Sequence, residues 1–278
     1  MSELDHPHPH MHHPMHKVEG PAGDGAHGHE HDHEHGKSKD YAEANKEHFN
    51  KTASHSVNEL WVELARRTAI AILDRYPFDE NSTTLMDFAC NIGEYSSHSS
   101  LLSRELAAHT KLLVGVDISE KAVDIFNEHV YNQGIPREEM RAVCADLKGE
   151  EGELDGLKFD VITCAASYHH FEDINKITKT LTFFLKPGGT LLVVDVTPKT
   201  HSHADGSSSS SAPQGDSTLF PEQYHHVVAH KHGISPEAIK AAFDGAGLCC
   251  YTFEPIDTFK VLGNEGTLFV AKGKKPLH

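Results

Sequence analysis

Residues 84–93 read TLMDFACNIG, an apolar run that contains one acidic residue and leads into a turn of small side chains. An apolar run of this length is typical of a short buried strand. Ala89 and Gly93 are small enough for a ligand to approach the backbone, and the helix expected from about Glu94 offers free N–H groups at its start. The segment therefore predicts a strand, a turn and a helix N-terminus that together hold a ligand.

The same alternation of strand and helix continues on both sides of this segment. On the N-terminal side, apolar residues recur at helical spacing from Val57 to Tyr76, and Pro77 ends the pattern. On the C-terminal side, Ser119 is expected to cap a helix that Gly134 ends. Further strands are expected at 111–117, 140–144, 159–165, 190–196, 249–254 and 267–272, and further helices at 94–109, 119–134, 173–185 and 235–246.

Continuous apolar strands separated by amphipathic helices predict an α/β fold with a mainly parallel sheet and helices on both faces. The last two strands are close enough in sequence to pair as an antiparallel hairpin. Residues 39–278 are expected to form this domain. A flexible Ser-rich insertion is expected to interrupt it at 199–219, because a structureless loop of this length is uncommon inside a compact domain.

Residues 1–38 hold eleven of the 25 histidines of the chain, mixed with Pro, Gly and acidic residues. Apolar residues are almost absent, so the segment cannot offset the entropy that an ordered backbone loses. We therefore expect a disordered His-rich tail. Imidazoles at this density can bind Zn²⁺ or Ni²⁺, but the composition favours a solvated low-complexity tail without a specific ligand.

The formal net charge of −16 argues against a nucleic-acid-binding surface, because phosphate recognition needs clustered Lys and Arg. No apolar run approaches the roughly 20 residues of a membrane span, and the N-terminus resembles neither a signal peptide nor a transit peptide. Most of the five cysteines lie in apolar strand-like runs, without metal-ligand spacing. We therefore expect a cytoplasmic protein with reduced core cysteines, and we interpret Cys249-Cys250 as strand rather than as a redox element.

Acidic residues also stand where two later strands end. Ligands of open parallel sheets bind at the carboxyl ends of the strands, near the point where the strand order reverses. Asp117 ends its strand where a carboxylate can accept hydrogen bonds from both hydroxyls of a ribose. Asp146 lies just past the next strand, where it can accept from an adenine amino group. Each could instead cap a helix or lie in a loop, but together with Asp87 the series favours a nucleoside site.

These motifs resemble, in the same order, those of the class I S-adenosylmethionine-dependent methyltransferases, and in particular the ubiquinone-biosynthesis-like small-molecule methyltransferases. Residues 85–93 resemble the first motif, Val116-Asp117 the second, and Ala145-Asp146-Leu147 the third. Residues 159–171 and 185–191 are similar to the fourth strand of that family and to its turn into the fifth. The resemblance covers roughly residues 80–200 and implies a Rossmann-like, seven-stranded, mainly parallel sheet with a reversed last strand.

The resemblance also implies S-adenosylmethionine as the cofactor. Asp87 would order the first turn, Gly93 would lie under the methionine portion, and Asp117 would hold the ribose. The family usually has glycine where this chain has Ala89 and Asn91; Ala89 is a small change, and Asn91 tolerates a positive φ. The implied cofactor-binding residues are Asp87, Ala89, Asn91, Gly93, Asp117, Ile118, Asp146 and Leu147 beside the adenine, and Cys164 and Ala165 beside the sulfonium.

Histidines are the candidates for a catalytic base. His169 and His170 follow the strand that ends near the expected methyl group, and an imidazole can take a proton near neutral pH. They could instead shape the pocket, or help Asp173 to cap the next helix. The second candidates are His225, His226, His230 and His232, after the insertion, which could equally form a polar surface connection. Near the N-terminus, Tyr41 and Phe49 could cover the cofactor or pack on the sheet edge.

The leading hypothesis is an enzyme that transfers a methyl group to an O, N, S or C atom of a small molecule, with no metal, nucleic acid or membrane involved. The alternative is a regulatory or interaction protein that keeps the cofactor-binding fold and uses the His-rich tail to bind metal. The altered glycine turn favours this alternative, whereas Asp117 and Asp146 oppose it. A nicotinamide dehydrogenase is disfavoured because the G-x-G-x-x-G fingerprint is missing.

Overall fold

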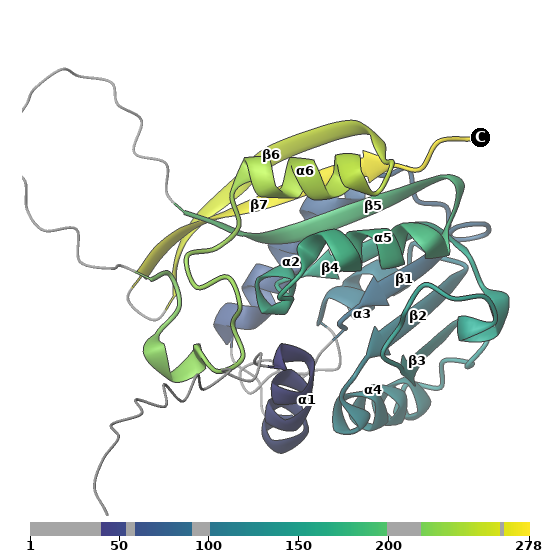
Figure 1. The fold of residues 1–278 in the computed structure, drawn as a ribbon. Helices are drawn as coiled ribbons and strands as arrows, with labels where there is room; N and C mark the ends of the chain where they lie inside the picture. The colour runs from purple at the N-terminus through teal and green to yellow at the C-terminus, as the bar shows by residue number, and fades with distance from the viewer. Residues whose placement is uncertain (1–39, 54–58, 91–100, 199–217, 262–263) are drawn as a thin grey trace, which may run out of the picture. The chain divides into compact units, whose positions relative to one another are not determined.

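The computed structural model describes residues 40–53, 59–90, 101–198, 218–261 and 264–278. Lys39–His278 form one compact unit, and Figure 1 shows its elements. The helices are α1 (Tyr41–Thr52), α2 (Glu59–Leu73), α3 (Leu101–Ala107), α4 (Glu120–Asn132), α5 (Ile174–Phe184) and α6 (Pro236–Gly245), with short 3-10 turns η1 (Glu153–Gly156), η2 (Tyr168–His170) and η3 (Glu222–Tyr224). The strands are β1 (Thr84–Phe88), β2 (Leu112–Asp117), β3 (Met140–Cys144), β4 (Phe159–Ala165), β5 (Leu185–Thr197), β6 (Cys249–Val261) and β7 (Asn264–Lys274).

These strands form one seven-stranded sheet in the order β3-β2-β1-β4-β5-β7-β6. β1 to β5 pair in parallel, and β7 runs antiparallel between β5 and β6. The predicted Rossmann-like sheet with a C-terminal antiparallel hairpin is therefore confirmed. The strand order reverses between β1 and β4, which is where an open α/β sheet forms its ligand crevice.

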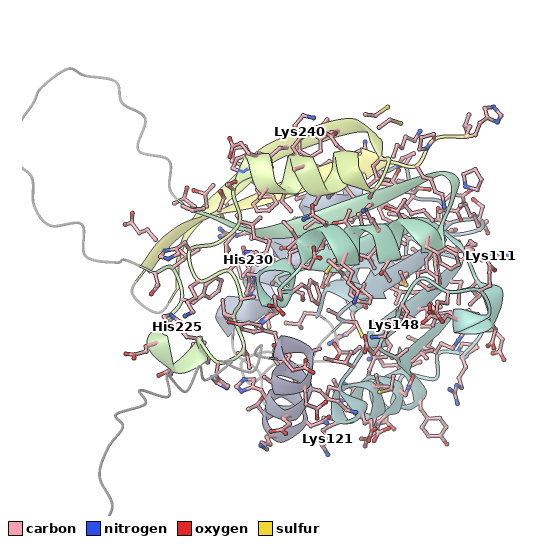
Figure 2. The ribbon with its side chains drawn as sticks, viewed as in Figure 1. Lys111, Lys121, Lys148, His225, His230 and Lys240 are labelled. Atoms are coloured by element: carbon pink, nitrogen blue, oxygen red, sulfur yellow. The ribbon has the colours of Figure 1, made fainter. Side chains whose placement is uncertain are left out.

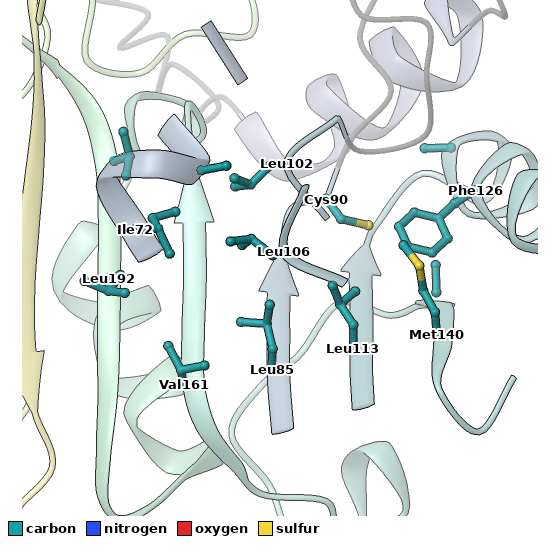
Figure 3. Close-up of a cluster of buried hydrophobic side chains, with 14 of the residues drawn as sticks. Ile72, Leu85, Cys90, Leu102, Leu106, Leu113, Phe126, Met140, Val161 and Leu192 are labelled. Atoms are coloured by element: carbon teal, nitrogen blue, oxygen red, sulfur yellow. The ribbon is translucent and has the colours of Figure 1, made fainter. Parts of the chain in front are cut away.

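Helices cover both faces of the sheet because the central strands β1, β2, β4 and β5 are largely apolar on both sides. On one face, buried residues of α2, α3 and α4 pack with residues such as Leu85 and Leu113 in one cluster. On the other face, α5 and α6 pack with the alternate strand residues, Met86 and Val114 among them. Figure 3 shows the first cluster, in which Leu192, Val161, Leu85, Leu113 and Met140 come from five neighbouring strands.

The expected helix signals are present in the structure. Ser119 Oγ accepts a hydrogen bond from the backbone N–H of Ala122 at 3.1 Å, and Asp173 caps α5 in the same way. Gly134, just after α4, has a φ of 71°, the left-handed conformation that ends a helix and favours glycine. Local sequence therefore sets these boundaries directly.

The structure also contains elements that the sequence did not predict. α1 is a helix of twelve residues, YAEANKEHFNKT, whose few apolar side chains give no clear periodicity. Asp40 caps it by accepting from the backbone N–H of Glu43 at 3.1 Å. β6 and β7 are longer than expected, because their pairing continues past the apolar core to Val261 and Asn264. Most of the expected insertion, 199–217, and the start of the expected helix at 94–109 lie outside the described residues.

Close packing of α6 on β7 gives a test of the fold. A Cβ atom on Gly273 of β7 would lie 2.6 Å from Phe243 Cδ2 and 3.1 Å from Leu248 Cβ. Gly273→Ala is therefore expected to lower the free energy of unfolding by about 1–3 kcal/mol, the usual cost of overpacking. Gly245→Ala, at the end of α6, meets nothing within 4 Å and is the matched control, expected to be neutral or slightly stabilising. Urea denaturation measures both; equal stability of the two variants would contradict this packing.

Candidate active site

A cavity of about 300 Å³ lies at the carboxyl ends of β1, β2 and β4 and beside the loop after β3. Residues of α1 line it on one side, and residues at the start of α5 line it on another. Phe88, Val116 and Phe171 contribute apolar walls. The volume is at the lower end of the range of small-molecule pockets, and the position is the strand-order reversal.

Asp87 lies on β1 directly behind this cavity rather than in its wall. Its side chain is buried, Ser103 Oγ of α3 donates a hydrogen bond to one carboxylate oxygen, and Thr163 Oγ1 of β4 donates to the other at 3.0 Å. Burial raises the pKa of Asp87 to about 6, although both hydroxyl donors act in the opposite direction. Its hydrogen bonds connect β1 to α3 and to β4, so Asp87 stabilises the structure just before the turn that follows β1.

Asp117 ends β2 and lines the cavity. Only 5% of the residue is exposed, and its Oδ1 accepts a hydrogen bond from the backbone N–H of Ser119 at 2.8 Å. This bond fixes the carboxylate at the start of α4. The neighbouring Ile118 is half-buried and also lines the cavity.

Asp146 and Leu147, after β3, both line the cavity but differ in exposure. Asp146 is exposed and forms an ion pair with Lys148 Nζ at 2.5 Å. Leu147 is buried and packs with the apolar cluster beneath α5. The pair can therefore present one polar and one apolar group to a flat ligand.

In the turn after β1, Ala89 stands where the family usually has glycine, and the sequence led us to expect that this replacement has little effect. Ala89 lines the cavity with a φ of 56°, the left-handed region in which a side chain costs about 1–2 kcal/mol relative to glycine. The expectation of a small change was therefore wrong in energetic terms. The predicted Asn91 and Gly93 lie outside the described residues.

Cys164 and Ala165, at the end of β4, lie next to the cavity but do not line it. The Cys164 side chain is fully buried, and burial holds the pKa of its thiol well above the ordinary range. Only the backbone of these residues could face a ligand, as the resemblance implies. Ser167, two residues further on, lines the cavity instead.

The two histidines after β4 lie in different environments. His169 is buried outside the cavity wall; its Nδ1 contacts Asp195 Oδ1 at 2.8 Å, and its ring stacks on Phe220 with the ring centroids 4.4 Å apart. His170 lines the cavity, and its ring centroid lies 4.3 Å from that of His169. The side chain of His170 is thus the better placed of the two to meet a ligand.

The backbone carbonyl of Val227 fixes the protonation of His170. His170 Nδ1 lies 2.8 Å from this oxygen, and a carbonyl can only accept, so Nδ1 carries the proton and Nε2 holds a lone pair. Asn45 Nδ2 of α1 donates to the same oxygen at 3.0 Å. Burial lowers the pKa of His170 to about 3, and the neighbouring His169 adds to this effect. The imidazole is therefore neutral at physiological pH.

Sequence reasoning missed Asn45 and Asp195. Asp195 lies near the carboxyl end of β5, is fully buried, and accepts from the backbone N–H of His169 at 3.2 Å as well as contacting its ring. A single acid within an apolar strand was a signal that could have identified it. Asn45 had no such signal, because its partner Val227 is 182 residues away in the chain.

The second group of candidate histidines lies in the segment between β5 and α6, and Figure 2 shows two of them, His225 and His230. His230 Nε2 donates to the carbonyl of Phe171 at 2.9 Å, and His225 Nε2 donates to that of Phe220 at 2.8 Å. His226 is exposed and bonds Gln223 O through Nδ1 at 2.8 Å, and His232 is also exposed. None of these four lines the cavity, so the predicted second candidates form a structural connection there.

Ionised groups give the cavity wall an acidic character. Lys148 and Lys176 are its two bases. Its acids outnumber them; they are Asp40, Asp117, Asp146, Glu172 and Asp173. Such a wall suits a ligand that carries positive charge better than one that carries several phosphates.

No group of three His, Cys, Asp or Glu side chains within the described part of the chain could hold a metal ion. Among the helices that the structure describes, none is long and apolar enough to cross a membrane.

Comparison with known proteins gives concordant matches. The family model described as a methyltransferase domain matches residues 57–252. An uncharacterised methyltransferase of Schizosaccharomyces pombe is 31% identical over 176 residues, which cover 61% of this chain and 54% of that protein. The ubiquinone biosynthesis O-methyltransferase of Coxiella burnetii is 32% identical over 107 residues, covering 38% of this chain and 41% of that protein. The chain thus spans about half the length of the curated relatives it matches.

The fold is also similar to solved structures. Phosphoethanolamine N-methyltransferase 2 of Haemonchus contortus, in complex with phosphomonomethylethanolamine and S-adenosylhomocysteine, aligns with a TM-score of 0.52. The alignment covers 75% of this chain and 52% of that one at 15% sequence identity, so it supports the fold alone.

The buried carboxyl group of Asp87 predicts a pH-dependent stability. Its pKa of about 6 lies above the ordinary 3.8, so between these values the folded state binds a proton that the unfolded state has lost. The free energy of unfolding should therefore fall as the pH rises from about 4 to about 6, by roughly 1–3 kcal/mol. Urea denaturation across this range should show the fall in the wild type and not in Asp87→Asn. The exposed Asp124→Asn should keep the wild-type slope; equal slopes in all three proteins would contradict a protonated Asp87.

Proposed function

Because the chain belongs to the methyltransferase-domain family, we propose that it is a class I enzyme that transfers a methyl group from S-adenosylmethionine to a small molecule. The observation that carries this proposal is that Asp117, at the carboxyl end of β2, and His170, just after the carboxyl end of β4, line the same cavity. One side chain suits the cofactor and the other suits the acceptor. The choice of cofactor is supported by the methyltransferase-domain match and by solved structures of similar fold that are in complex with S-adenosylmethionine or S-adenosylhomocysteine.

The residues present fit a nucleoside with a positively charged sulfur. Asp117 offers a carboxylate at the end of β2 for the two ribose hydroxyls, and Ile118 lies beside it. Leu147 supplies an apolar surface for a base, and Asp146 an acceptor for an exocyclic amine. The surplus of acids in the wall complements a sulfonium.

Asn45 of α1 adds a further polar group to the cavity wall. Its Nδ2 donates to Tyr41 O at 2.7 Å and to Val227 O at 3.0 Å, so the orientation of the amide is determined. Its Oδ1 is buried and has no hydrogen-bond partner within the described residues. Buried acceptors are normally satisfied, so we propose that a small shift of α1 on ligand binding supplies the missing donor.

S-adenosylmethionine, when bound, supplies a methyl group that is already activated by its positive sulfur and leaves by in-line displacement. The protein must then align the acceptor and, where the acceptor carries a proton, accept that proton. His170 Nε2 is the lone pair available for this task, because Nδ1 donates to Val227 O. We therefore assign His170 rather than His169 as the base.

The low pKa of His170 restricts the chemistry that it can support. A base with a pKa of about 3 is always unprotonated at neutral pH but accepts a proton only from an acidic donor. An oxygen acceptor becomes such a donor as it gains the methyl group and positive charge, because an oxonium ion is strongly acidic. We therefore propose that the acceptor is an O–H group whose proton leaves late in the transfer. A neutral amine fits this arrangement less well, because its methylated product is a weakly acidic ammonium ion.

His169 and Asp195 act as supports in this proposal. Asp195 holds the His169 ring by its Nδ1, and the ring packs against His170. Burial would raise the pKa of Asp195, but His169 and the backbone N–H groups around it outweigh that effect and lower the pKa. The carboxylate thus stays ionised and keeps both rings in place. The alternative, a regulatory protein with a metal-binding tail, receives no support from the relatives.

Asp117→Ala tests the cofactor site. Loss of hydrogen bonds from a buried carboxylate should weaken S-adenosylmethionine and S-adenosylhomocysteine binding by about 1.5–3 kcal/mol, while the protein stays folded. Isothermal titration calorimetry measures the affinities, and circular dichroism checks the fold. Asp124→Ala, which removes an exposed acid from α4, is the matched control and should bind as the wild type does. If the wild type binds neither compound, or if the folded variant binds both unchanged, the proposed function is wrong.

His170→Asn tests the base. A panel of phenols, alcohols and amines, assayed by S-adenosylhomocysteine formation, first identifies an acceptor. The variant should then transfer methyl roughly 10²–10⁴ times more slowly with unchanged cofactor affinity. The rate of the wild type should show no histidine titration between about pH 5 and 8, because the pKa of His170 is about 3. His226→Asn, an exposed histidine outside the cavity, should keep full activity; a fall of similar size in both variants would sink the assignment.

A further inference from the structure

Two adjacent cysteines lie outside the site described above, at the amino end of the edge strand β6. Both Cys249 and Cys250 are exposed, and their sulfur atoms are 3.6 Å apart. The sequence led us to expect core cysteines, and that expectation was wrong for this pair and for the exposed Cys144. Only Cys90 and Cys164 are buried.

An irregular backbone brings the two sulfur atoms together. In a regular strand, consecutive side chains point to opposite faces, which would separate neighbouring thiols. Here Cys250 has a φ of 55°. Cys249 pairs with Lys274 and Thr252 with Lys272, so three steps along β6 match two along β7, and the extra residue forms a bulge. The bulge turns both thiols to the same side.

A bulge on an edge strand can also serve to block pairing with another sheet. That role explains why a bulge is present but not why the left-handed residue within it is Cys250. A left-handed φ favours glycine or asparagine, and any other side chain costs about 1–2 kcal/mol. Cysteine at this position therefore has an unfavourable conformation whose visible result is contact between two thiols.

We propose that Cys249 and Cys250 form a reversible dithiol–disulfide site that is oxidised by a small disulfide such as oxidised glutathione. One thiolate attacks the reagent, forms a mixed disulfide and releases one glutathione thiolate. The second thiol loses its proton and attacks the protein sulfur of the mixed disulfide, which releases the second glutathione. The protein loses two electrons and two protons, and the reagent becomes two thiols.

The position of the pair makes the product easy to reduce. Adjacent Cα atoms are about 3.8 Å apart. Disulfides usually join Cα atoms at least about 4.4 Å apart, and a departure from this range strains the bond. Strained and exposed disulfides are the labile ones. The site is therefore expected to open again with reduced glutathione or dithiothreitol.

The experiment uses the reduced full-length protein and excess oxidised glutathione. Intact-mass spectrometry should show the loss of two hydrogens in the wild type, and peptide mapping should place the bond between residues 249 and 250. Titration of native thiols should fall by two and recover with dithiothreitol. Cys144→Ser, which removes the other exposed thiol, should behave in the same way. Cys249→Ser and Cys250→Ser should each instead gain one glutathione at the other cysteine of the pair.

Stable glutathione adducts on both cysteines of the wild type would overturn the proposal, as would a disulfide that joins two chains on a non-reducing gel. Phenylarsine oxide, which bridges two neighbouring thiols, gives an independent check. It should protect Cys249 and Cys250 from alkylation in the wild type and should not protect the remaining cysteine in either single variant. Protection in the single variants would show that the thiols react separately.

Discussion

The buried carboxyl group of Asp87 holds together the part of the molecule on which the site depends. β1 and β4 are neighbours in the sheet but their connections leave in opposite directions, and the crevice exists because of that divergence. Hydrogen bonds from Ser103 and Thr163 to Asp87 keep α3, β1 and β4 in contact just below the crevice. Burying a carboxyl group in an apolar layer costs free energy unless each of its oxygen atoms has a hydrogen-bond partner. Here the hydroxyl groups of Ser103 and Thr163 are those partners.

A second junction closes the cavity above these hydrogen bonds. The carbonyl of Val227 accepts from Asn45 of α1 and from His170 after β4, so one backbone atom links three segments that are distant in the chain. The same bond to His170 sets which ring nitrogen keeps its lone pair. Asn45 is the one buried residue of α1, whereas α4 and α5 each bury several side chains, so α1 is the element that can move when a ligand enters. Cavity closure and the protonation of the proposed base therefore depend on the same atom.

Local sequence patterns predicted the sheet, the helix caps and the acids at the strand ends, because these features depend on residues a few positions apart. Asp117, Asp146 and Leu147 were predicted and do line the cavity. What could not be predicted depends on contacts over long separations. The pairing of Asn45 with Val227 leaves no periodic signal in either segment, and the lone acid Asp195 in an apolar strand does not reveal that His169 is its partner. The exposure of Cys249 and Cys250 was missed because their apolar neighbours indicate a regular strand, whereas a bulge changes their direction.

Backbone strain marks the two strand ends that border the crevice. Ala89 follows β1 with a φ of 56°, and Ala166 follows β4 with a φ of 51°. A left-handed residue turns the chain sharply out of the sheet, and hydrogen bonds hold both turns: Cys90 N donates to Val116 O at 3.2 Å, and Ala166 N donates to Val194 O at 2.7 Å. Each alanine costs about 1–2 kcal/mol more than glycine, a cost that the surrounding sheet must offset. The two turns direct the chain away from the sheet on either side of the strand-order reversal, and the cavity lies there because these turns leave space for a ligand between them.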